Sequence, residues 1–297
     1  MSSMSKTYNY DEWGVAYSSD WKTLIGADCD TFQCEHYRIR EGVTHIEANA
    51  FLSCLALKSL WMPDSVVEEE GCLCEGCKNL EKARISVNIK HPEIAMFCGC
   101  SSLKKIDLHE GLESIGENMF IGCTSLKNIK IPSTVKFMCS DTFCSTAIED
   151  IELPDALESI GYDTFIGCNS IKRLIIPKHV KEIGPWLVQS HENFEGLTCL
   201  SPHFRIENDA LISNSENSLI ACWSKEREYH VPVSVKQIGS ICNDMIETII
   251  VNSPLDMIGW DAFVSCKNLK RIIYNAPVKH ADVSYGCEHI EGAPQKR

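Results

Sequence analysis

Five cysteines and one histidine crowd a 29-residue stretch of this chain and are its best candidates for chemistry: Cys72, Cys74, Cys77, Cys98, Cys100 and His91. Thiolates and imidazoles are the usual ligands of structural zinc, and neighbouring thiols can also form disulfides or redox pairs. Structural zinc sites usually carry two Cys-x2-Cys knuckles, which this stretch does not have. A third interpretation is that these cysteines are buried core residues.

An internal repeat of about 23 residues accounts for part of this cluster. Residues 43–65 read VTHIEANAFLSCLALKSLWMPDS, and residues 112–134 read LESIGENMFIGCTSLKNIKIPST. The shared frame is an aliphatic residue, an Ile three positions later, a Phe, a Cys, a Leu, a short apolar strand and often a Pro. Repeats begin at Val43, Val66, Ile89, Leu112, Val135, Leu157, Val180, Val235 and Leu255.

One column of this frame holds Cys54, Cys77, Cys100, Cys123, Cys168 and Cys266. A small apolar thiol with a weak S–H donor suits a buried turn, where it packs and meets a backbone carbonyl. We therefore interpret the column as core and predict free thiols, although neighbouring members can come within disulfide reach. Because Cys74 falls in the Phe column, a metal site would have to rely on Cys72, Cys98 and His91.

The other columns indicate how the repeats fold. Phe51, Phe97, Phe120, Phe143, Phe165 and Phe263 share one column, and Ile46, Ile115, Ile160, Ile183, Ile238 and Ile258 share another. Short apolar strands recur at residues 60–62, 106–108, 129–131, 151–153, 174–176, 249–251 and 272–274. Their outer residues should face inward and the middle residue outward. Stacked repeats of this kind bury one continuous core, which predicts a solenoid.

The pattern V-x-x-I-x-x-x-A-F-x-x-C-x-x-L-x-x-L-x-x-P of residues 43–63 resembles the BspA-type leucine-rich repeat family, and so does LESIGYDTFIGCNSIKRLIIP at 157–177. The resemblance covers about residues 14–277. It implies a leucine-rich repeat solenoid, a right-handed β/α superhelix of mostly short parallel strands with turns and short helical segments. Members are best known as adhesion-related surface or secreted proteins of host-associated bacteria and some protists, and the family offers no catalytic residue or cofactor.

Irregular stretches set the expected domain boundaries. We expect an N-terminal cap with an irregular first repeat at 1–42, a solenoid at 43–277 with an irregular longer repeat at 180–234, and a C-terminal tail at 278–297. GVAYSSDWKTLI, residues 14–25, parallels DALISNSENSLI, residues 209–220, and each leads to a Tyr-led restart. The second repeat carries Glu69 in the Ile column and Cys74 in the Phe column, which predicts local distortion.

Charge and composition narrow the function classes. The net charge of −13 disfavours nonspecific binding to nucleic acid or anionic lipid. No apolar run approaches the ~20 residues that span a bilayer, and the opening residues lack the pattern of a secretory signal. We expect a cytoplasmic protein, or a surface or secreted one if a signal was removed.

Two surfaces are candidates for binding. The outward middle residues of the strands are Trp61, Arg84, Asp107, Lys130, Glu152, Ile175, Ile250 and Ile273. A basic row precedes the strands and comprises Lys58, Lys82, Lys104, Lys105, Lys127, Lys172, Arg173, Lys270 and Arg271. The row either keeps the strand edge soluble or docks an acidic partner, and Glu81, Glu149, Asp150 and Glu247 interrupt it.

The sequence therefore predicts a non-catalytic protein that binds another protein through its extended solenoid surface. No phosphate loop, zinc-protease motif or serine-hydrolase elbow appears, so we expect no enzyme and no cofactor. Two alternatives stay open. One is a surface or secreted adhesin of a host-associated microbe, and the other is a metal-binding or thiol-dependent module around Cys72, Cys74 and Cys98.

Overall fold

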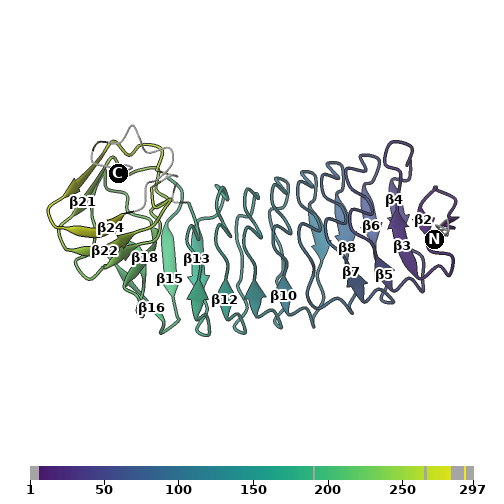
Figure 1. The fold of residues 1–297 in the computed structure, drawn as a ribbon, viewed down its shortest axis with the longest axis horizontal. Helices are drawn as coiled ribbons and strands as arrows, with labels where there is room; N and C mark the ends of the chain where they lie inside the picture. Colours follow the sequence, from purple (N-terminus) through teal and green to yellow (C-terminus); the bar gives the residue numbers. More distant parts are fainter. Residues whose placement is uncertain (1–6, 190, 264–265, 282–290, 292–297) are drawn as a thin grey trace, which may run out of the picture. The chain divides into compact units, whose positions relative to one another are not determined.

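The computed structural model describes residues 7–189, 191–263 and 266–281, together with Glu291. The chain forms two compact units, unit 1 at residues 1–156 and unit 2 at residues 157–297. Both are built from short strands and turns that recur about every 23 residues and stack side by side as a β-solenoid (Figure 1). The predicted solenoid of mostly parallel strands is confirmed, whereas the finer boundaries at 42, 180–234 and 277 stay a prediction.

The strands that the apolar columns predict form one ladder in unit 1. It runs through β4 (His36–Arg38), β6 (Ser59–Trp61), β8 (Lys82–Arg84) and β9 (Lys105–Asp107), all parallel and in register. Leu60 and Met62 are buried, and Trp61 between them is only partly covered. The predicted strands at 129–131 and 151–153 do not form, because pairing there is reduced to a single bridge between Asn128 and Asp150.

A second ladder lies on the returning segments, where the sequence predicts no separate sheet. In unit 1 it comprises β3 (Thr23–Gly26), β5 (His45–Ile46) and β7 (Glu68–Glu69), and, further along, β10 (Ser114–Ile115) with β11 (Phe137–Met138). Antiparallel strands β1 (Asn9–Tyr10) and β2 (Ala16–Tyr17) precede it. The Ile column therefore supplies short two-residue strands rather than a plain connection.

The predicted short helical segments are wrong, since the described residues contain no helix. Backbone N–H groups of the returning segments donate to the next turn, as Phe97 does to Met119 (3.1 Å) and Phe120 to Thr142 (3.0 Å), and in between they donate only three positions back, as Cys98 does to Ala95 (3.1 Å). Residues at regular spacing, such as Asn118 and Asp141, also take left-handed backbone angles near φ 57°. A helix needs a run of right-handed residues and bonds to the residue four positions earlier, so neither condition is met.

Aromatic side chains of the Phe column fill the core. Within unit 1, the rings of Phe97 and Phe120 stack with centroids 6.0 Å apart, and those of Phe120 and Phe143 stack at 5.5 Å. All six phenylalanines of the column are at most 1% exposed. Stacking equal repeats thus places like residues beside like, as the sequence predicts.

Unit 2 carries the same two ladders and an antiparallel addition. β12 (Ser159–Ile160) pairs with β14 (Glu182–Ile183), and β13 (Arg173–Ile176) pairs with β15 (Gly196–Cys199), both parallel. β16 (Phe204–Glu207), β17 (Ala210–Ser213) and β18 (Ser218–Cys222) then form an antiparallel meander. The parallel order resumes as β18, β20 (Gln237–Ile238), β22 (Leu255–Ile258) and β24 (Val278–Ala281).

The remaining ladder of unit 2 comprises β19 (Glu228–His230), β21 (Thr248–Val251) and β23 (Arg271–Tyr274), all parallel. The two stretches that resemble each other in sequence form equivalent hairpins, β2–β3 and β17–β18, each with a bulge, and each leads into a parallel ladder. Of the predicted tail, residues 278–281 form β24, and nearly all the rest lies outside the described residues. No helix in the described part of the chain is long and apolar enough to cross a membrane.

Candidate binding surfaces

The cysteine column is buried and bonded to the backbone. The thiol of Cys77 donates to the carbonyl of Phe51 (2.9 Å), that of Cys100 to Cys74 (3.1 Å) and that of Cys123 to Phe97 (3.2 Å). Burial raises the pKa of the Cys100 thiol far above its usual range and that of Cys123 to about 12. These groups stay protonated and act as weak donors inside the core, which confirms the structural interpretation of the column.

One column member departs from this pattern. Cys54 forms a disulfide with Cys29, with 4.6 Å between the two Cα atoms, a separation within the usual disulfide range. The prediction of free thiols is therefore wrong for this pair. The sequence reasoning missed it because Cys29 lies in the irregular first repeat, outside the column.

The cysteines proposed for metal binding do not converge on a site. Cys74 is fully buried, and burial raises its pKa well above the usual thiol value. Cys72 and Cys98 are partly exposed, and burial raises the pKa of each, to about 11 for Cys72. His91 is hydrogen-bonded to Ser114 through Nδ1 (3.1 Å). Among the described residues, no three or more His, Cys, Asp or Glu side chains are arranged to hold a metal ion.

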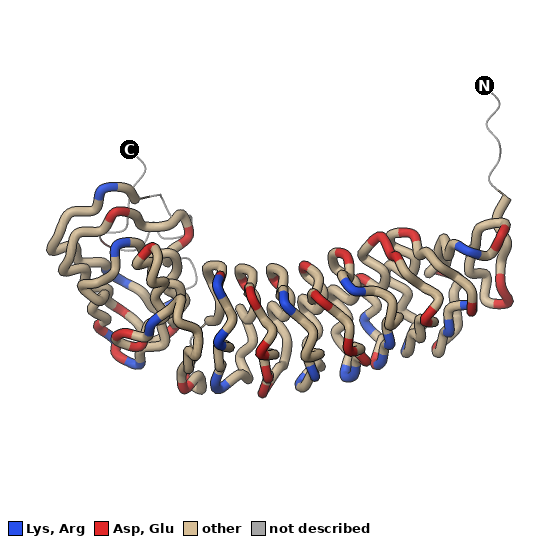
Figure 2. The backbone as a smooth tube through the Cα atoms, turned by 90° about the horizontal axis from the view of Figure 1, so that it is seen from below, with Lys and Arg blue, Asp and Glu red and all other residues tan. Residues whose placement is uncertain are grey.

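The basic row is largely neutralised by acids of neighbouring turns. Five of its members form ion pairs: Lys58 with Glu35 (2.7 Å), Lys104 with Glu81 (3.4 Å), Lys127 with Glu149 (2.9 Å), Arg173 with Glu195 (2.5 Å) and Lys270 with Glu247 (2.7 Å). Figure 2 shows basic and acidic positions interspersed on neighbouring turns. Three of the four acids that interrupt the row in sequence, Glu81, Glu149 and Glu247, are thus its ion-pair partners. Solvent-exposed pairs of this kind are worth about 0–1 kcal/mol each.

The outward face of β4, β6, β8 and β9 has a different character. The Trp61 ring lies between two guanidinium groups, that of Arg38 at 4.2 Å and that of Arg84 at 5.1 Å from its centroid. Arg84 is held in place by Asp64 (2.6 Å) and by the carbonyl of Met62 (2.7 Å). The register of the strands brings Arg38, Trp61 and Arg84 into one row across the sheet.

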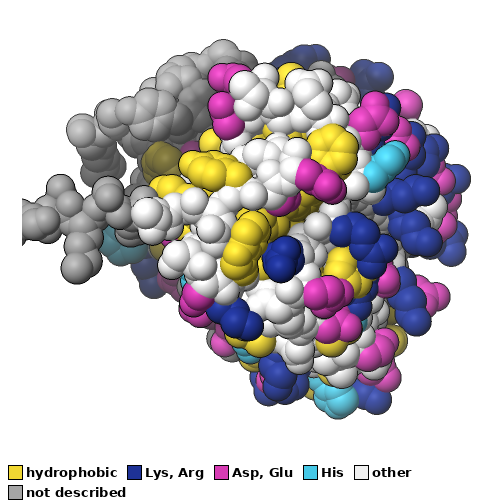
Figure 3. Space-filling view, turned by 90° about the vertical axis from the view of Figure 1, so that its right-hand side faces the viewer, with side chains coloured by type: hydrophobic (Ala, Val, Ile, Leu, Met, Phe, Trp, Pro, Cys, Tyr) yellow, Lys and Arg dark blue, Asp and Glu magenta, His cyan; other side chains and the backbone are white. Residues whose placement is uncertain are grey.

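This face, hereafter the Trp61 face, also carries a local excess of positive charge. A hollow of about 390 Å³ lies over it and is lined by His36, Arg38, Ser59, Trp61, Lys82, Arg84, Lys105 and Asp107, together with the backbone beneath them. In the described residues, Lys82 and Lys105 have no ion-pair partner. Figure 3, which faces the N-terminal end of the chain, shows Lys and Arg side chains gathered along its right-hand edge.

The other predicted outward residues are less uniform. Lys130 and Glu152 line a further hollow of about 550 Å³ in unit 1, and both are exposed. In unit 2, Ile175 is 54% exposed and Ile273 is partly exposed. Ile250 is only 8% exposed, so the expectation that it faces solvent is wrong. The alternation of strand residues therefore predicts the outward side correctly in unit 1 and fails at β21, where Ile249, Ile250 and Val251 are all buried.

The second repeat is well packed, contrary to the predicted distortion. Glu69 is 4% exposed and Cys74 is fully buried, and β7 keeps register with β5. The ladder ends at β7, because in the next turn Pro92 takes the Ile position and has no N–H to donate. The Glu69 carboxylate accepts the N–H groups of Gly71 (2.7 Å) and Glu93 (2.6 Å) at this break. Burial raises its pKa above the ordinary value of 4.5.

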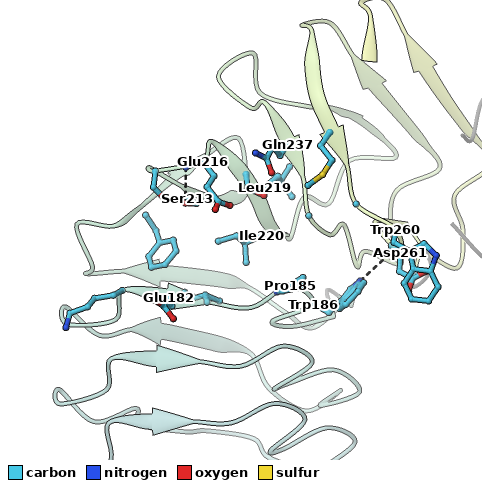
Figure 4. A pocket seen from close by; sticks show the side chains of 18 residues that line it. Glu182, Pro185, Trp186, Ser213, Glu216, Leu219, Ile220, Gln237, Trp260 and Asp261 are labelled. Atoms are coloured by element: carbon cyan, nitrogen blue, oxygen red, sulfur yellow. Dashed lines mark hydrogen bonds between the residues drawn. The ribbon is translucent and has the colours of Figure 1, made fainter. Parts of the chain in front are cut away.

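Unit 2 contains a cleft that the sequence analysis did not find, hereafter the β14 cleft. It encloses about 390 Å³ between β14 on one side and β18, β20 and β22 on the other (Figure 4). Its apolar lining includes Ile183, Pro185, Trp186, Phe204, Met257 and Trp260, and its charged and polar lining includes Lys181, Glu182, Glu216, Gln237 and Asp261. A related signal in the sequence is the irregular longer repeat that we predict at 180–234.

A model of the BspA type leucine rich repeat region matches residues 27–146, 138–230 and 194–287 of the chain. No curated protein sequence matches it significantly. Among solved structures, the fold is similar to a leucine rich cell surface protein from Faecalibacterium prausnitzii A2-165, with a TM-score of 0.59, 17% identity, and coverage of 99% of this chain and 100% of that one.

Two further structures show the same fold. A leucine-rich repeat protein from Bacteroides ovatus matches with a TM-score of 0.58 and 22% identity over 92% of this chain and 74% of that one. The pneumococcal vaccine antigen PcpA matches with a TM-score of 0.57 and 16% identity over 93% and 78% of the two chains. At these identities the likeness concerns the fold, and the binding surfaces must be argued from this chain's own residues.

Proposed function

Because the chain belongs to the BspA-type leucine-rich repeat family, in which repeats stack into an extended surface, we propose that it is a non-catalytic protein that binds another protein. We further propose that the Trp61 face of unit 1 makes the contact. The observation that supports this most strongly is the Trp61 ring held between Arg38 and Arg84. Tryptophan and arginine dominate the energetic centres of protein interfaces.

The arrangement supports binding because its side chains are already ordered. Arg84 is fixed by Asp64 and by the Met62 carbonyl, and its guanidinium holds one side of the Trp61 ring. When a partner covers this face, the Arg84 and Trp61 side chains lose little additional conformational entropy. Loss of side-chain entropy is a main cost of association. The strands beneath provide a rigid base, since β4, β6 and β8 pair in register.

Charge indicates the kind of partner. On the Trp61 face, Arg38, Lys82 and Lys105 have no ion-pair partner among the described residues and Arg84 is paired with Asp64, so the cations outnumber the outward acid Asp107 on a chain whose net charge is −13. Complementary potentials speed association and select against wrong partners. The proposed partner is therefore a protein with an acidic surface that carries an apolar group for Trp61.

The test compares capture of proteins from an extract of the source organism by the wild-type chain, by Trp61→Ala and by a matched control, Ile175→Ala. Ile175 is an outward residue of the corresponding strand column in unit 2 and is 54% exposed. We expect one or more acidic proteins to be lost with Trp61→Ala and kept with Ile175→Ala. Binding of the purified candidate should then weaken at least tenfold with Trp61→Ala, and equal binding by both variants would remove the proposal.

A second candidate function is the surface or secreted adhesin. It is supported by the Cys29–Cys54 disulfide, because disulfides persist mainly in oxidising compartments. The test is mass analysis of native protein alkylated without reduction. Protection of Cys29 and Cys54, with the other thiols alkylated after unfolding, supports this candidate, and alkylation of both in protein kept from air oxidation contradicts it.

A further inference from the structure

β14 is an open strand edge inside unit 2. In the preceding turn, the carbonyl of Glu158 accepts the N–H of Lys181 (2.8 Å), and the carbonyl of Ile160 accepts the N–H of Gly184 (2.9 Å). The equivalent carbonyls of the next turn belong to Lys181 and Ile183, and no N–H among the described residues donates to them. The sheet ends at β14, because the antiparallel meander β16–β18 replaces the next parallel strand.

The side chains around this edge are also incompletely covered. Ile160 and Ile238 of the Ile column are 2% and 0% exposed, whereas Ile183 is only partly buried and lines the β14 cleft. Across the cleft, Met257 is 39% exposed and Trp260 is 57% exposed. Soluble proteins usually block an open edge with charge, proline or a covering segment. β14 carries Glu182 and is followed by Pro185, but no segment covers it among the described residues and an apolar hollow lies beside it.

Trp186 forms a fixed wall of this hollow. It occupies the repeat position that takes a left-handed backbone angle, at φ 55°, where other turns carry Asn118, Asp141 and Asp163. A bulky side chain rarely adopts this conformation, whereas Asn and Asp tolerate it. Its backbone N–H donates to Ser240 Oγ (2.9 Å), and its indole Nε1 donates to the carbonyl of Asp261 (3.3 Å), as Figure 4 shows for the latter.

The charge of the lining is complementary to a basic ligand. Glu182, Glu216 and Asp261 face the cleft, and the one cation of its lining, Lys181, is already paired with Glu158 at 2.7 Å. An aromatic ring beside carboxylates favours an ammonium or guanidinium group, which gains from both. A volume of about 390 Å³ lies within the range of small-ligand pockets.

We propose that the β14 cleft binds an extended, Lys- or Arg-bearing segment of a partner protein, which adds to β14 as a parallel strand. Two N–H groups of the segment, three residues apart, donate to the carbonyls of Lys181 and Ile183, as Lys181 and Gly184 do to the preceding turn. Apolar side chains of the segment cover Ile183, and its basic side chain lies between Trp260 and the cleft carboxylates. This mode is strand addition to a sheet edge, and it is independent of the Trp61 face.

The experiment measures binding of an acetylated and amidated Val-Lys-Val-Lys-Val-Lys peptide to the full chain by calorimetry at low salt. We expect saturable one-to-one binding. A Val-Glu-Val-Glu-Val-Glu peptide should bind at least tenfold more weakly because of the acidic lining. A peptide N-methylated at alternate residues should also bind at least tenfold more weakly, because methylation removes the N–H groups that strand addition needs.

Variants locate the site. Trp260→Ala and Glu216→Lys, both at exposed positions, should each weaken binding of the Val-Lys peptide at least fivefold. Glu216→Lys should leave the thermal midpoint of the chain unchanged, and Trp260→Ala should keep the circular dichroism spectrum of the wild type. Trp61→Ala, which tests the other surface, should not change peptide affinity.

Three binding results would overturn the proposal. They are absence of binding up to 1 mM peptide, equal binding of the N-methylated peptide, and weakening by Trp61→Ala as large as that by Trp260→Ala. A chain that is dimeric alone and that the peptide dissociates would assign the edge to a second copy, which also overturns a partner segment.

Discussion

Among the described residues, the parallel ladder on the returning segments is interrupted once in each unit, and the two interruptions differ in their hydrogen bonding. In unit 1 the ladder ends at β7, where the N–H of Glu93 donates to the Glu69 carboxylate. The equivalent N–H one turn earlier, that of Glu70, donates to the main-chain carbonyl of Ile46. In unit 2 it ends at β14, where a meander leaves the carbonyls of Lys181 and Ile183 without a donor among the described residues. One interruption is closed by a side chain, and the other forms a cleft.

The difference shows that nearby hydrogen-bond donors and acceptors decide whether a strand edge in a solenoid is closed or left open. A hollow of about 220 Å³ remains beside Glu69, but a buried carboxylate bonds the next turn across it. The β14 cleft is larger, at about 390 Å³, and has apolar walls with acids at its rim. The first break is therefore bonded to the next turn, whereas the second leaves the hollow in which we propose that a partner segment binds.

The largest expected effect is the difference in unfolding free energy between truncating a covered residue and truncating an uncovered residue of the Ile column. Ile115→Ala should cost about 2–5 kcal/mol of unfolding free energy, because Ile115 is fully buried and its removal leaves a cavity. Ile183→Ala should cost about 1 kcal/mol, since Ile183 already faces the cleft. Denaturant unfolding followed by circular dichroism measures both. Equal costs would mean that β14 is covered in solution.

The next effect tests whether Glu69 closes the first break. Glu69→Ala leaves the N–H groups of Gly71 and Glu93 without their acceptor, which should cost about 1–3 kcal/mol. Glu182→Ala, at the exposed edge of the second break, should change the unfolding free energy by less than about 0.5 kcal/mol. Thermal and denaturant unfolding of the two variants gives the comparison, and a neutral Glu69→Ala would show that water replaces the carboxylate without loss.

A smaller effect is the pH dependence that Glu69 confers. Its folded-state pKa is raised by burial, so the folded chain holds this proton more tightly than the unfolded chain. Its contribution to stability is therefore present below the ordinary pKa of 4.5 and is lost as pH rises through the raised value. Each tenfold difference in proton affinity between the folded and unfolded chains corresponds to about 1.4 kcal/mol. The unfolding free energy of Glu69→Gln relative to wild type should thus rise with pH above 4.5, and a constant difference would contradict the raised pKa.

The smallest effect concerns an ion pair of the basic row in unit 1. Lys127→Ala removes the exposed pair with Glu149, and the unfolding free energy should fall by less than about 0.5 kcal/mol. Arg84→Ala, by contrast, removes bonds to Asp64 and Met62 and one cation–π contact with Trp61, and should cost about 1–2 kcal/mol. Both costs are measured in low and in 0.5 M salt, and only the first should vanish there.

Much of the fold could be predicted from the residues because the repeat imposes it. The Phe and Cys columns are buried as expected, and thiol donors meet carbonyls of the preceding turn. The helical segments could not be excluded, since the choice between local and next-turn hydrogen bonds depends on how closely neighbouring turns approach. The prediction of a distorted packing at Glu69 was likewise wrong, because the sequence pattern cannot show that the Glu69 carboxylate accepts two backbone N–H groups.

The sequence by itself determined the period of the array, the core columns and the outward position of Trp61, and it predicted an irregular repeat at 180–234. Only the tertiary structure decided that acids of neighbouring turns pair with the basic row, that Arg38 and Arg84 enclose Trp61, and that the interruption opens a cleft. The reason is separation along the chain. A column repeats every 23 residues and is visible as a pattern, whereas Trp186 meets Asp261 across 75 residues, a contact that no periodicity records.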